Sequence, residues 1–170
     1  MERWKPTLSP SRRSVALAVL LLAGRAKAET QPCAPPTVLF VCPAGTVKSA
    51  IARETLKRRA AQTGVAVRVV SRGVHPEDHV SPALKASLQA DGIDPRAEPV
   101  KALVPEDLAR ADIVIAFDEA AQAPGLQTAR TWEIPSWNSQ YPEAKAALGA
   151  RIDGLLAELR TRDAKPCGRS

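Results

Sequence analysis

The chain has 170 residues, of which 25% are charged and 4% are aromatic, and its formal net charge is +6. This length is enough for one domain with its own core. The first 28 residues hold six of the 24 lysines and arginines but only one of the 18 acidic residues. The remainder is therefore nearly neutral and has few aromatic side chains, which excludes a basic protein that binds nucleic acids by stacking on their bases.

Residues 1–28 have the pattern of a secretory signal peptide. Basic residues up to Arg13 precede nine apolar residues at 15–23, and Ala26-Lys27-Ala28 is a small-x-small cleavage site. The apolar run is shorter than the roughly 20 residues that span a bilayer. The sequence predicts export to the periplasm or the exterior, by the general or the twin-arginine route, with no membrane attachment after cleavage. A short buried helix is the alternative.

The remaining chain alternates between patterns of strands and helices. After an irregular leader at 29–36, the apolar run 37–41 predicts a buried parallel strand. A loop of small residues leads to a helix over 47–62, which Gly64 ends. The later patterns predict a strand over 65–71, a helix capped by Ser81 and closed by Gly92, a short helix over 105–110, strands over 112–117 and 129–134, and a last helix over 142–160.

This alternation predicts a three-layer α/β domain over residues 37–161, followed by a tail at 162–170. Its four parallel strands form one sheet with helices on both faces. Ligands of such sheets bind at the carboxyl ends of the strands. The loop after the first strand lies at such an end and is the candidate site.

Cys42, at the end of the first predicted strand, has the surroundings of a nucleophile. Amide groups in a loop of small residues before a helix N-terminus form a cradle for anions, and the helix dipole favours the thiolate. Cys42, Lys48 and Ser49 are the candidate catalytic residues. The candidate phosphate-binding residues are Ala44, Gly45, Thr46, Val47 and Lys48. A small buried residue at a strand end is the alternative interpretation of Cys42.

Residues 42–49 resemble the Cys-x5-Arg-Ser/Thr loop of low-molecular-weight protein tyrosine phosphatases and thioredoxin-linked arsenate reductases. Segments 71–74, 84–94, 111–118 and 132–137 are similar to the family in order and spacing. The resemblance implies hydrolysis of a phosphate monoester without a metal or other cofactor. Cys42 would attack phosphorus, the loop amides would hold the oxygens, and Ser49 would hydrogen-bond the sulfur.

Two positions depart from the family pattern. Lys48 replaces the arginine, whose planar fork binds two phosphate oxygens, and Ser136 stands where the family has its aspartic acid. Glu133 is a candidate replacement for that acid. The sequence therefore predicts an exported phosphatase with weakened activity, which acts on a phosphate ester. The alternative is an inactive periplasmic pseudophosphatase that binds a free oxyanion.

The other two cysteines stand near the chain ends. In an oxidising compartment, Cys33 and Cys167 are expected to form a disulfide that leaves Cys42 free, and two unpaired thiols are the alternative. Arsenate reduction is disfavoured because it needs a relay of cysteines near the nucleophile.

Two further groups have a functional and a structural interpretation. His75 and His79 are interpreted as part of a polar surface loop rather than a metal site, because Pro76 breaks the spacing between them. Trp132, Trp137 and Tyr141 would either line the mouth of the pocket or pack against the last helix.

Overall fold

The computed structural model describes residues 34–163. These residues form one sheet of four parallel strands, ordered β2-β1-β3-β4. The strands are β1 (Thr37–Cys42), β2 (Arg68–Gly73), β3 (Ile113–Phe117) and β4 (Arg130–Trp132). The predicted α/β class with a four-stranded parallel sheet is confirmed.

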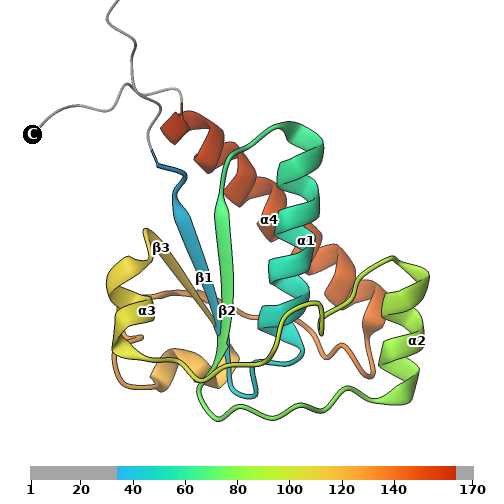
Figure 1. Cartoon of the computed structure of the whole chain (residues 1–170). Helices are drawn as coiled ribbons and strands as arrows, with labels where there is room; N and C mark the ends of the chain where they lie inside the picture. The colour runs from blue at the N-terminus through green and yellow to red at the C-terminus, as the bar shows by residue number, and fades with distance from the viewer. Residues whose placement is uncertain (1–33, 164–170) are drawn as a thin grey trace, which may run out of the picture. The chain divides into compact units, whose positions relative to one another are not determined.

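Helices cover both faces of this sheet, as predicted. Figure 1 shows α1 and α4 side by side on one face and α3 on the opposite side. The helices are α1 (Lys48–Thr63), α2 (Pro82–Ala90), α3 (Pro105–Arg110), the 3-10 helix η1 (Asp118–Gln122) and α4 (Tyr141–Asp163).

Alternate side chains of β1 enter two separate apolar clusters. Val38 and Phe40 pack with α1 and α4, whereas Leu39 and Val41 pack on the other face. Each fully buried side chain of this kind contributes about 1.5–3 kcal/mol. β1 is a central strand of the sheet, and both of its faces are covered. Its sequence is therefore a continuous apolar run.

The second strand begins three residues later than the sequence predicts. Gly64 adopts a left-handed conformation with φ of 68°, and the amide of Val65 donates to the carbonyl of Ala60 over 3.0 Å. That amide completes the end of α1 and is not available to the sheet. The hydrogen bonds that join β2 to β1 and to the residue before it begin at Arg68, whose amide donates to the carbonyl of Pro36.

A buried arginine links α1 to β2. Arg53 is 2% exposed, and its guanidinium donates to Ser71 Oγ at 2.7 Å, to the carbonyl of Pro95 at 3.1 Å and to Glu54 at 2.6 Å. A buried charge needs such partners. The bonds hold the start of α1 against the carboxyl half of β2, next to the candidate site.

Several predictions fall on the ends of the chain. The signal peptide and the disulfide between Cys33 and Cys167 lie outside residues 34–163, as do most of the leader and tail. Within 34–163, no helix combines the length and the apolar character needed to cross a bilayer.

A partly buried ion pair attaches α3 to the sheet. Arg72 on β2 donates from Nε and Nη2 to the two carboxyl oxygens of Asp107, and each hydrogen bond is 2.7 Å long. Burial raises the pKa of Asp107, but the hydrogen bonds from Arg72 and from the amide of Val104, together with the nearby positive charges, hold the pKa below the usual 3.8.

Asp107→Asn should lower the free energy of unfolding at neutral pH by about 1–3 kcal/mol, because Arg72 loses a charged acceptor. The pKa of Asp107 is lower in the folded state, so its contribution is complete above 3.8 and is lost as the pH falls through the folded value. Urea unfolding at neutral and acidic pH should therefore show a difference from wild type that shrinks in acid. Glu106→Gln, which removes an exposed charge from the same helix, is the control. A difference independent of pH would contradict this account.

Candidate active site

Outward hydrogen bonds determine the direction of the loop amides after β1. The carbonyl of Pro43 accepts from the amide of His75 at 2.8 Å, and the carbonyl of Ala44 accepts from the amide of Glu77 at 3.0 Å. In a trans peptide the next N–H points the opposite way. The amides of Ala44 and Gly45 therefore face the inside of the loop, and the amide of Gly45 donates to Cys42 Sγ at 3.2 Å.

Two glycines allow the loop to lie directly on the end of β2. Gly45 has φ of 76°, and a Cβ there would lie 2.7 Å from the backbone nitrogen of Gly73. A Cβ on Gly73 would in turn lie 2.8 Å from the carbonyl carbon and oxygen of Ala44. No larger residue fits either position without moving backbone atoms, so this contact fixes the curvature of the loop.

The N-terminus of α1 completes the cradle. Val47 is the N-cap residue and makes no side-chain capping bond. The first amides of a helix have no partner within it, and the helix dipole places partial positive charge there. The start of α1 is therefore a suitable place for an oxyanion.

Cys42 lies at the floor of a cavity of about 330 Å³. The residue is 3% exposed, and its Sγ lies 3.1 Å from Ser49 Oγ. That hydroxyl also lies 3.4 Å from the carbonyl oxygen of Arg72. A thiolate only accepts hydrogen bonds, so an ionised Cys42 would accept a hydrogen bond from the hydroxyl of Ser49.

Lys48 is bound on the wall of this cavity by two acceptors. Its ammonium forms an ion pair with Asp118 and donates to the carbonyl of Ile134 at 2.8 Å. An ammonium has three donors, so one remains for an oxyanion. Asp118 has φ of 52°, the only positive φ of a non-glycine residue within 34–163. Strained backbone of this kind occurs preferentially at functional sites.

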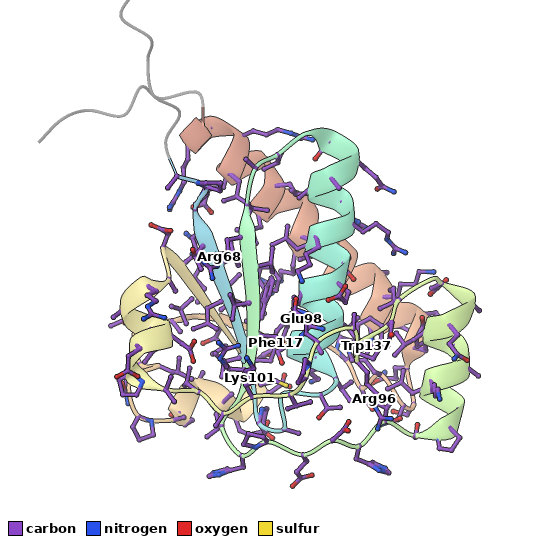
Figure 2. The ribbon with its side chains drawn as sticks, viewed as in Figure 1. Arg68, Arg96, Glu98, Lys101, Phe117 and Trp137 are labelled. Carbon is purple, nitrogen blue, oxygen red and sulfur yellow. The ribbon has the colours of Figure 1, made fainter. Side chains whose placement is uncertain are left out.

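The rest of the cavity wall comes from η1 and the segment before α4. Glu119, which follows Asp118, lines the cavity together with Ser136, Trp137 and Asn138. Trp137 is 3% exposed, packs on Tyr141 with ring centroids 5.4 Å apart, and has a buried Nε1 without a partner among the described residues. Figure 2 shows Trp137 on the side of the molecule where α2 lies.

The structure brings together only part of the predicted phosphate-binding set. Ala44, Val47 and Lys48 line the cavity with Cys42, whereas Gly45 and Thr46 are not among its lining residues. Glu133, the candidate replacement acid, does not line it either. Within 34–163, no group of three or more histidine, cysteine or acidic side chains is placed to hold a metal ion.

The three predicted aromatic residues have different places. Trp137 lines the cavity, but Trp132 packs in the core with ring centroids 5.8 Å from Phe40 and 6.0 Å from Phe117. The hydroxyl of Tyr141 donates to Asp91 at 2.5 Å. Burial and the neighbouring carboxylate of Asp91 raise the pKa of Tyr141 far above its usual value.

Asp118 and Glu119 line the cavity, although neither is among the site residues that the sequence predicts. Their position in the sequence could have indicated this, since both come directly after an apolar strand. The carboxyl ends of parallel strands share one edge of the sheet, where ligands bind. The order β2-β1-β3-β4 puts β3 directly beside β1, so both acids lie next to the Cys42 loop.

Comparison with known proteins agrees with this geometry. The sequence profile of the low molecular weight phosphotyrosine protein phosphatase family matches residues 37–146. No curated protein sequence matches the chain.

Solved structures with the same fold include three bacterial proteins. YfkJ from Bacillus subtilis is 18% identical with a TM-score of 0.61, over 76% of this chain and 98% of that one. YwlE arginine phosphatase from Geobacillus stearothermophilus is 23% identical with a TM-score of 0.60, over 80% and 100%. A thioredoxin-dependent arsenate reductase from Corynebacterium glutamicum is 23% identical with a TM-score of 0.58, over 76% and 64%.

Gly73→Ala should weaken phosphate binding by at least about tenfold, equivalent to about 1.4 kcal/mol. The added Cβ meets the backbone of Ala44 at 2.8 Å, and the loop must move. Isothermal titration calorimetry with inorganic phosphate measures the effect. Gly154→Ala on α4, where an added Cβ meets nothing within 4 Å, is the matched control and should bind as wild type does. Unchanged affinity in Gly73→Ala would show that the glycine contact does not shape the site.

Proposed function

Because this chain belongs to the low molecular weight phosphotyrosine protein phosphatase family, we propose that it is a cysteine-dependent hydrolase of phosphate monoesters. The family supports phosphatase or arsenate-reductase chemistry. The observation that carries the hydrolase proposal is the position of Cys42 Sγ, 3.2 Å from the amide of Gly45 and 3.1 Å from Ser49 Oγ at the cavity floor. Cys42 is also the only cysteine within 34–163, whereas arsenate reduction needs further thiols nearby.

In the first step, the thiolate of Cys42 attacks phosphorus and the bond to the ester oxygen breaks. The phosphoryl group is then covalently attached to sulfur. The inward amide of Ala44 and the first amides of α1 would donate to the oxygens on which charge develops, while the amide of Gly45 donates to the sulfur. Donors that are already oriented stabilise such a transition state without reorganisation.

In the second step, water attacks phosphorus and the bond between phosphorus and sulfur breaks. The electron pair returns to Cys42 as a thiolate, and inorganic phosphate leaves. The hydroxyl of Ser49 donates to the departing sulfur and so lowers the cost of its charge. The buried position of Ser49 keeps the hydroxyl beside the sulfur.

We also propose that turnover is weaker than an arginine at position 48 would give. The ammonium of Lys48 is a point donor, and its charge is already balanced by Asp118. Losing one preorganised donor typically lowers the rate by roughly 10²- to 10³-fold.

Binding of a free oxyanion without turnover is the second candidate function. Two observations favour this second function. Lys48 is paired with Asp118, and Ser136, a hydroxyl, stands at the position expected for the acid. The amide cradle that would hold a phosphoryl group would equally hold phosphate, arsenate or sulfate.

Export is part of the proposal. Its support is the pattern of residues 1–28: a basic start, nine apolar residues and the cleavage site Ala26-Lys27-Ala28. An exported enzyme of this class would act on phosphate esters in the periplasm or the surrounding medium.

Hydrolysis of para-nitrophenyl phosphate by wild type and Cys42→Ser tests the function. The variant should lose roughly 10³-fold or more in kcat, because the nucleophile is removed, while phosphate binding in calorimetry persists. Equal rates in the two proteins would reject the hydrolase proposal. Phosphate binding without turnover in either protein would select the second candidate, and an absence of binding would remove that candidate as well.

A further inference from the structure

The ester oxygen that leaves in the first step needs a proton unless its alcohol is strongly acidic. Ser136, at the position that should supply the acid, is a hydroxyl on the cavity wall. A hydroxyl is too weak an acid for this role at neutral pH. The proton must then come from another side chain, and the cavity wall offers carboxyl groups for this role.

Three carboxyl groups come into question, and the structure separates them. Asp118 is on the wall, but its carboxyl group is occupied by the ion pair with the ammonium of Lys48. Glu133 does not line the cavity. Glu119 lines it and is exposed, and its side chain makes no hydrogen bond or ion pair with any residue in 34–163.

A second hollow shows where the leaving group would lie. It has a volume of about 350 Å³ and adjoins the Cys42 cavity, because Pro43 and Glu119 line both. Its other wall residues are mostly apolar: Val74, His75, Ala120, Gln122, Ala123 and Pro124. An apolar hollow beside an oxyanion site suits the organic part of a phosphate ester. Glu119 thus stands at the border between the phosphoryl group and the leaving group.

We propose that Glu119 is the catalytic acid of this site. The inference rests on the proposed hydrolase function. In the first step, the carboxyl proton of Glu119 passes to the ester oxygen as the bond between phosphorus and oxygen breaks, and Glu119 becomes a carboxylate. In the second step, that carboxylate takes a proton from the attacking water, the bond between phosphorus and sulfur breaks, and the acid is restored. Proton and electron pairs balance over the cycle.

The dependence of kcat/KM on the leaving group tests this role. Phenyl phosphate releases a basic phenolate and needs the proton, whereas 2,4-dinitrophenyl phosphate releases a stable anion and does not. Glu119→Gln should reduce kcat/KM by about 10²-fold or more with phenyl phosphate and far less with 2,4-dinitrophenyl phosphate. Glu119→Asp, which keeps the acid on a shorter side chain, should restore part of the loss.

Two further variants, each with a glutamate replaced by glutamine, complete the experiment. Glu143→Gln, an exposed change in the first turn of α4, is the control for loss of charge and should match wild type on both esters. Glu133→Gln tests the competing acid. Phosphate binding by calorimetry, unchanged in each variant, shows that the cradle is intact.

Each other outcome overturns the assignment. If Glu119→Gln equals wild type, or loses the same factor with both esters, Glu119 is not the acid although the hydrolase proposal stands. If Glu133→Gln shows the selective loss instead, Glu133 is the acid. If wild type hydrolyses neither ester, the hydrolase proposal falls and the role of Glu119 falls with it.

Discussion

The site depends on a backbone contact between Gly45 and Gly73, which brings the loop after β1 onto the end of β2. The absence of side chains at both positions lets the carbonyls of Pro43 and Ala44 reach the amides of His75 and Glu77. Those outward bonds turn the following amides inward, toward the sulfur. Backbone geometry alone thus provides most of an anion site, and the side chains add to it.

The charges around the cavity are more nearly balanced than the sequence of the loop after β1, with Lys48 at its end, implies. Lys48 provides a positive charge, but Asp118 is paired with it on the cavity wall. The attraction for an oxyanion must then come chiefly from oriented amides and the dipole of α1. A site of this kind binds an anion through the orientation of its N–H donors rather than through its net charge. It also keeps two carboxyl groups beside the phosphoryl position.

The sequence predicts the fold and the position of the loop between β1 and α1 well because both depend on local patterns. Apolar runs, Gly64 and the capping residue Ser81 mark elements whose bounds differ by a few residues from those observed. The remaining site residues depend on which strands are neighbours. Asp118 reaches Lys48 only because β3 pairs with β1, across 70 residues of chain. Arg53 occupies the buried face of α1 at helical spacing, yet its acceptors come from β2 and from Pro95. No local pattern announces those partners.

Direct detection of the covalent intermediate is the most decisive measurement. Wild-type protein mixed with 2,4-dinitrophenyl phosphate, quenched in acid and digested, is examined by mass spectrometry. Our account predicts one phosphoryl group on the peptide that contains Cys42, attached at sulfur. Continued hydrolysis with that peptide unmodified, or with the phosphoryl group on another residue, would contradict it.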